Sequence, residues 1–140
     1  ASTYRRSTEG VFLLTAVFMS MTNWTAVLWG FLAGIVASLL AFFVPIIGHV
    51  GAGLIAGGVA GYLAGGGLGS GAWHGLLAGA LDGIVLVLLI VPLATIVGGI
   101  GAGPLGGLVG GIGVLTIGLV IAFVVAIDSA IGGAIGALFS

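Results

Sequence analysis

The sequence contains no cysteine and very little charge, with two Lys or Arg and three Asp or Glu among 140 residues. The absence of cysteine excludes disulfide bonds, thiolate metal ligands and S-acylation. A net charge of −1 excludes a polybasic surface for nucleic acid or anionic lipid head groups. Two histidines are too few for a histidine-rich metal site, and the chain has no motif for nucleophilic catalysis or phosphate binding. We therefore expect a protein that is not an enzyme and binds no cofactor, metal or nucleic acid.

Apolar residues and glycine dominate the chain instead. Hydrophobic residues make up 61% of the sequence, 30 residues are glycine, and residues 10–81 contain no Lys, Arg, Asp or Glu. A soluble domain normally has about 25% charged residues, whereas this chain has 4%. The composition predicts an integral protein of the cell membrane.

The predicted fold is an all-α membrane bundle of four transmembrane helices, formed by residues 23–140. A helix needs about 20 apolar residues to cross a bilayer. Glycine-rich connections are expected at residues 65–71 and 98–107, the second of which contains Pro104. The four predicted spans are residues 24–44, 46–66, 73–97 and 108–127, and an extension of the last span to residue 137 remains open.

Residues 1–22 are predicted to form an N-terminal extension with an apolar helix. This helix is too short to span a bilayer alone, so it would lie in the interface or pack against a partner. Arg5 and Arg6 ahead of an apolar stretch also fit a removed signal peptide. The same two arginines place the N-terminus in the cytoplasm by the positive-inside rule, which predicts a multi-pass protein of that orientation.

Small residues recur at four-residue spacing along the predicted spans. This spacing places them on one helix face, where the lack of side chains lets two helices in a bilayer approach closely. Such faces would either hold the four spans together or bind another subunit, including a second copy of the chain. The predicted helix-packing residues are Gly30, Gly34, Gly53, Gly57, Gly61, Gly65, Gly71, Gly75, Gly79 and Gly83.

Asp82 interrupts the apolar sequence, because the third span must extend back past it to be long enough. A carboxylate inside a membrane costs about 2.5–3.5 kcal/mol on insertion scales and often serves proton or cation transfer. Asp82 is therefore a candidate protonatable site, and helix capping or a hydrogen bond in the protein is the structural alternative. Pro92 lies in the same span and is predicted to kink it, which makes it a candidate hinge.

Two further polar residues are candidate protonatable or polar sites. Asp128 follows twenty apolar residues and is predicted to mark a membrane boundary. His74 follows Trp73, a residue type that is enriched at the level of the lipid head groups, and we expect His74 in the membrane interface.

Four sequence stretches resemble a haloarchaeal family of small glycine-rich multipass membrane proteins. They are Asn23-Trp-Thr-Ala-Val-Leu-Trp-Gly30, Ala56-Gly-Gly-Val-Ala-Gly-Tyr-Leu-Ala-Gly65, Trp73-His-Gly-Leu-Leu-Ala-Gly-Ala80 and Asp128-Ser-Ala-Ile-Gly-Gly133. The resemblance covers residues 22–140. Because that family has no assigned function, the resemblance bears on fold and host alone.

Three functions are consistent with these observations. The first is a structural or accessory subunit that lies in the lipid bilayer and forms a homo-oligomer or part of a membrane complex through its small-residue faces. The second is a minimal transporter or channel for a proton, an ion or a small solute, with Asp82 as its site. The third is a membrane protein of a virion or vesicle.

Overall fold

A computed structural model describes residues 8–13, 21–41, 43 and 45–140, and the side chains of all of these except 45–50. These residues form α2 (Trp24–Ala41), α3 (Pro45–Ala64) and α4 (Leu68–Ala137), and residues 8–13 are also helical. The described part of the chain contains no β-strand. The predicted all-α class is therefore confirmed.

Local sequence explains where α2 and α3 begin and end. Asn23 precedes α2, and its side-chain oxygen accepts a hydrogen bond of 3.2 Å from the Ala26 backbone N–H, as an N-cap residue does. Pro45 is the first residue of α3, a position where its missing N–H costs no helical hydrogen bond. After α3, residues 65–67 are glycines with φ between 61° and 88°, which ends the helix and turns the chain into α4.

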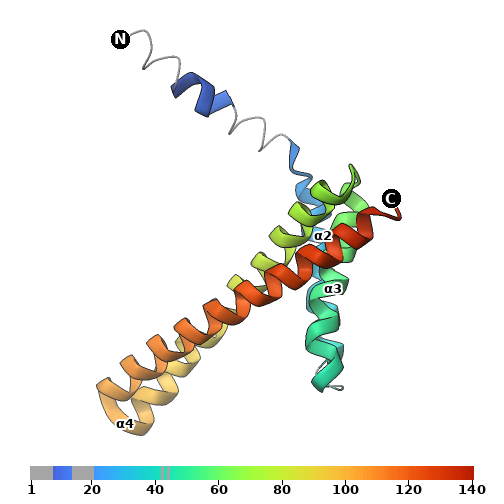
Figure 1. Cartoon of the computed structure of the whole chain (residues 1–140). Coiled ribbons are helices and arrows are strands. Elements are labelled where there is room, and N and C mark those ends of the chain that lie inside the picture. The colour runs from blue at the N-terminus through green and yellow to red at the C-terminus, as the bar shows by residue number, and fades with distance from the viewer. Residues whose placement is uncertain (1–7, 14–20, 42, 44) are drawn as a thin grey trace.

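The long helix α4 is a hairpin of two arms, residues 68–101 and 104–137, that lie side by side (Figure 1). Its break is confined to Ala102 and Gly103, and Gly103 has φ 71° and ψ −166°, a conformation that only glycine adopts readily. The predicted connection at residues 98–107 is therefore too long, because only two of these residues leave the helix. The arms stay helical up to the break because Gly98 and Gly106 bring their backbones into direct contact, and a Cβ on either would overlap the other's carbonyl oxygen.

Two helices are long and apolar enough to cross a membrane, namely Trp24–Ala41 with mean hydropathy 1.9 and Leu68–Ala137, whose 18-residue apolar segment has mean hydropathy 2.7. In α3, the apolar segment whose side chains are described, Gly51–Ala64, is shorter than either of these two helices. The connection before α4 is also shorter than predicted, because residues 68–71 already belong to the helix. The third and fourth predicted spans are therefore longer helices than the sequence indicated.

The helices pack around a small core in which Val27, Ala60 and Ala78 are fully buried. α3 has its most extensive contacts with α4, and α2 contacts α3 more than α4. Trp24, Tyr62 and Trp73 lie where α2 begins, α3 ends and α4 begins, and we call this the aromatic end. From there α4 crosses the α2–α3 pair obliquely and extends past it (Figure 1). We call residues 84–121 the distal hairpin.

Candidate functional site

Three helix segments meet without intervening side chains at Ser129 and Gly133, in the second arm of α4. A Cβ on Gly57 of α3 would overlap the Ser129 carbonyl oxygen and would lie 2.9 Å from the Gly133 nitrogen. From the other side, a Cβ on Gly75 of the first arm would lie 2.9 Å from the Gly133 Cα. The fully buried Ser129 hydroxyl donates a hydrogen bond of 2.8 Å to the Gly75 carbonyl oxygen. Backbone contact and this interhelical hydrogen bond together hold the three segments.

The glycines that the sequence singled out lie mostly on faces used inside the chain. On α2, Gly30 approaches the Ala60 Cβ and Gly34 approaches the Ala56 Cβ, so that added Cβ atoms would lie 2.6 Å and 2.9 Å from them. Gly65 differs, because it lies in the turn after α3 with φ 61° and serves chain reversal. The others, which all face a neighbouring helix or arm, are Gly53, Gly57, Gly61, Gly71, Gly75, Gly79 and Gly83.

The two acidic residues of α4 each lie against a glycine near the middle of another helix. A Cβ on Gly34 of α2 would lie 3.0 Å from the Asp82 Cγ, and one on Gly53 of α3 would lie 2.7 Å from an Asp128 carboxylate oxygen. Both carboxylates are half-buried, and neither makes a hydrogen bond or an ion pair with another described residue. Among the described residues, Asp82 and Asp128 are therefore polar groups without a hydrogen-bonded or ion-paired partner.

His74 belongs to a hydrogen-bonded cluster at the aromatic end and is only 2% exposed. Its Nε2 accepts a hydrogen bond of 2.8 Å from the Asn23 backbone N–H, and its Nδ1–H donates one of 2.7 Å to the Ser70 carbonyl oxygen. Beside it, the Trp73 indole donates to the Thr22 hydroxyl at 3.2 Å. Because one ring nitrogen accepts and the other donates, the imidazole is neutral and connects the start of α2 to the start of α4.

Asp128 lies nine residues before the end of α4 and beside the middle of α3, and the expectation that it marks a membrane boundary stays a prediction. The extension of the fourth predicted span to residue 137, which the sequence left open, is helical. Pro92 lies inside the first arm with helical backbone angles, and the break of α4 falls ten residues later at Ala102. Arg5 and Arg6 lie outside the described residues, as does most of the predicted N-terminal helix.

Ser129 and Asn23 are structural polar residues that the sequence reading missed. A buried serine among small residues carries no periodic signal of its own, whereas Asn23 directly before an apolar run is a recognisable N-cap pattern. Within the described residues, no group of three His, Cys, Asp or Glu side chains is placed to hold a metal ion. Among the described residues of α2, α3 and α4, the acidic groups are thus the carboxyls of Asp82 and Asp128.

Comparison with known proteins gives one family relationship. Neither the curated proteins nor the solved structures include a match to the chain. A family model does match residues 24–139, which is most of the chain and includes α2, α3 and all of α4. The protein therefore belongs to DUF5518, a family of unknown function.

Proposed function

We propose that this protein is a non-enzymatic, multi-pass integral membrane protein that acts as a structural or accessory subunit of a membrane assembly. Its four transmembrane helices would be α2, α3 and the two arms of α4. The resemblance to glycine-rich multipass membrane proteins of haloarchaea forms part of this proposal, as does an N-terminus in the cytoplasm.

The observation that carries the proposal is the surface of the distal hairpin. Large apolar side chains are exposed around both arms, among them Leu88 at 66%, Ile100 at 83% and Leu105 at 75%. Its two threonines donate their hydroxyl hydrogens to carbonyls of their own helix, so neither hydroxyl needs water as a partner. Exposing one such apolar side chain to water costs about 1.5–3 kcal/mol of free energy relative to burying it. A hydrocarbon environment, supplied by lipid or by an apolar partner, removes this cost.

Helix lengths and the oblique crossing also support insertion in a single bilayer. At 1.5 Å per residue, α2 and α3 are ~27–30 Å long, which matches the ~30 Å hydrocarbon core. Each arm of α4 is ~50 Å long, so that at a tilt of up to ~40° its ends would extend past the hydrocarbon core into the head-group region. The crossing of the hairpin over the α2–α3 pair supplies such a tilt (Figure 1). Short upright helices and long tilted ones would thus span one membrane.

The small-residue faces leave little room for a partner, because they contact one another within the chain. A partner subunit would therefore contact the large apolar side chains of the distal hairpin. The cysteine-free sequence allows a direct test by disulfide cross-linking in membranes. Leu88→Cys, at a 66% exposed position, should give cross-linked species, whereas Val87→Cys at its 9% exposed neighbour should not.

The experiment begins with alkaline carbonate extraction of membranes, which should leave the chain in the pellet. Native mass in mild detergent should then exceed that of one 13.5 kDa chain, through self-association or a co-purifying subunit. Release into the supernatant would contradict the membrane placement. A monomer without partners, combined with equal cross-linking of the two cysteine variants, would contradict the role as a subunit.

A minimal proton or ion transporter is the second candidate, and the two carboxyls favour it. Asp82 and Asp128 lie beside the middle of α2 and α3, which corresponds to the middle of the bilayer in the proposed arrangement. Charged residues at this depth in membrane proteins commonly mark ion or proton pathways. In liposomes, Asp82→Asn should abolish flux if this function holds, whereas Glu9→Gln, outside the bundle, should not. Absence of flux in the unaltered protein would reject this candidate.

A further inference from the structure

A buried histidine joins the start of α2 to the start of α4 through two backbone groups. The His74 Nε2 accepts a hydrogen bond of 2.8 Å from the Asn23 N–H, and its Nδ1–H donates one of 2.7 Å to the Ser70 carbonyl oxygen. A backbone N–H can only donate and a carbonyl oxygen can only accept, so the two partners hold the neutral imidazole in one tautomer. We call this arrangement of Asn23, His74 and Ser70 the histidine joint.

Protonation of His74 is incompatible with this joint. The imidazolium carries a hydrogen on both ring nitrogens, so Nε2 would direct an N–H at the Asn23 nitrogen 2.8 Å away, which carries its own hydrogen. Neither nitrogen of an imidazolium accepts a hydrogen bond, so rotation of the ring offers no alternative. The side chain is only 2% exposed, which also keeps water from the new charge. Uptake of a proton therefore requires the joint to open.

The neighbouring elements offer the charged ring no carboxylate. On α4, Asp82 lies eight residues further along the same arm, ~12 Å at 1.5 Å per residue, and Asp128 of the second arm lies against the middle of α3. The sequence of α2 contains no titratable side chain, and α3 has Tyr62 at the aromatic end and His49 at its opposite end. Among the described residues, none of these side chains forms a hydrogen bond or an ion pair with His74.

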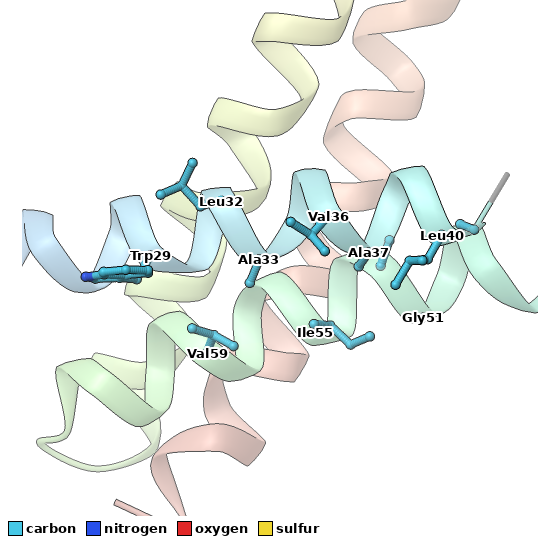
Figure 2. Close-up of a pocket in the computed structure, with 11 residues that line it drawn as sticks. Trp29, Leu32, Ala33, Val36, Ala37, Leu40, Gly51, Ile55 and Val59 are labelled. Carbon is cyan, nitrogen blue, oxygen red and sulfur yellow. The ribbon is translucent and has the colours of Figure 1, made fainter.

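The other contacts of α2 do not weaken in acid. Beside α3, a groove of about 690 Å³ is lined by apolar residues alone, from Trp29 to Leu40 along α2 (Figure 2). Against α4, the titratable side chain that faces α2 is Asp82, beside Gly34. A neutral carboxyl is easier to bury than a carboxylate, so protonation of Asp82 would strengthen that contact. Among the described contacts of α2, acid therefore weakens the histidine joint.

We propose that His74 is a pH-sensitive switch, at which uptake of a proton releases the start of α2 from the start of α4. Opening is reversible, because Asn23 is exposed and its N–H can donate to water once the imidazole has moved away. The neighbouring Thr22, whose hydroxyl accepts a hydrogen bond of 3.2 Å from the Trp73 indole, would leave its partner in the same movement. The switch goes beyond the proposed subunit role and does not depend on placement in a membrane.

The direction of the switch follows from the number of protons that each state holds. The closed joint holds one proton fewer than the open joint, so a rise in pH favours closing and a fall in pH favours opening. One proton changes the ratio of open to closed molecules by at most about tenfold per pH unit. Histidine ordinarily changes its charge between about pH 5 and 8, which sets the range to be tested.

Labelling of introduced cysteines in mild detergent tests the switch, because the sequence contains no cysteine of its own. Ala26→Cys places a thiol in the first turn of α2 at a position that is 1% exposed, and Thr25→Cys places one at the exposed neighbouring position. The ratio of the two labelling rates cancels the pH dependence of the thiol reaction itself. From about pH 7.5 to about pH 5 this ratio should rise about tenfold.

His74→Gln is the matched control. The glutamine side-chain oxygen can accept from the Asn23 N–H, as Nε2 does, but the amide takes up no proton in this pH range. In this variant the ratio of labelling rates should stay constant. A constant ratio in the protein that retains His74 would overturn the proposal. An equal rise in the His74→Gln variant would also overturn it, because another titrating group would then be responsible.

Tryptophan fluorescence gives a second measurement that needs neither a cysteine nor a change at His74. Trp24→Phe combined with Trp29→Phe leaves Trp73 as the one tryptophan of the chain. When the joint opens, water replaces the Thr22 hydroxyl at its indole, so acid should shift the emission to longer wavelength. The shift should follow uptake of a single proton over the same pH range as the labelling. Emission that does not change with pH, or a steeper transition that needs several protons, would overturn the proposal.

Discussion

Replacing Gly57 by alanine should destabilise the protein, whereas the same change at the adjacent Gly58 should not. A Cβ on Gly57 would overlap the Ser129 carbonyl oxygen and lie 2.6 Å from the carbonyl carbon. A Cβ on Gly58 would have its nearest neighbour, the Gly132 carbonyl oxygen, at an ordinary 3.8 Å. Both positions lie inside α3, so the gain of about 1 kcal/mol in helix propensity on going from glycine to alanine applies to both and cancels in the comparison.

The difference between the two variants therefore reports the cost of overpacking at the contact of α3 with α4. Inserting a methyl group into a closely packed interior typically costs about 1–3 kcal/mol. Because the obstacle at Gly57 is backbone and not a flexible side chain, we expect a difference near the upper end of this range. Titration with a denaturing detergent, followed by far-ultraviolet circular dichroism in micelles, measures the free energy of unfolding of each variant. Equal stability of the two variants would refute the packing of Gly57 against the second arm of α4.

Three further changes test other contacts in the same unfolding assay. His74→Phe should cost about 1 kcal/mol, because the Asn23 N–H loses its acceptor in a partly buried hydrogen bond; no loss would show that this hydrogen bond does not form. Ser129→Ala removes an interhelical hydrogen bond and should cost about 0.6 kcal/mol, the average for such bonds in membrane proteins, and a loss above 2 kcal/mol would point to a different role. Gly103→Ala should cost about 1–3 kcal/mol through backbone strain alone, whereas Gly101→Ala, in open helical surroundings, should cost nothing; a reversed order would contradict the position of the break.

The packing faces illustrate what four-residue spacing can and cannot predict. Glycine at this spacing requires a close neighbour, and Gly30, Gly57 and Gly75 all have one. The spacing does not specify the neighbour, because a flat helix face fits another helix of the same chain or of a second copy equally well. In the structure these faces contact other helices of the same chain. A partner would therefore contact the large apolar side chains of the distal hairpin and not the glycines.

The hairpin tip shows where helix propensity misleads. In water a glycine costs about 1 kcal/mol in a helix interior relative to alanine, so the glycine-rich residues 98–107 read as a loop. Contact between Gly98 and Gly106 overrides that local preference, and only Ala102 and Gly103 leave the helix. A preference measured in isolated helices cannot anticipate a contact between two backbones that exists only once both arms have formed.

The candidate polar residues differ in how far the sequence could place them. Asp82 was recognisable because the apolar residues after it are too few to span a bilayer alone. For Asp128, the preceding apolar run of span length predicts a membrane boundary, which stays a prediction, and α4 continues nine residues beyond it. The partners of His74, on residues 51 and 4 positions away, depend on how α2 meets α4 in three dimensions.

In the proposed membrane placement, the uncharged tip of α4 has a consequence for how the protein would enter a bilayer. Residues 83–127 contain no charged side chain, and the break at Ala102 and Gly103 adds none. Moving one charged residue to the centre of a membrane costs about 2.5–3.5 kcal/mol on insertion scales, and the leading end of this hairpin is free of that cost. Both arms can therefore cross together from the side that keeps the aromatic end, with Asp82 and Asp128 following only as far as the middle. Insertion of α4 would then be one step in which both arms move together, and its direction would set the topology of the whole protein.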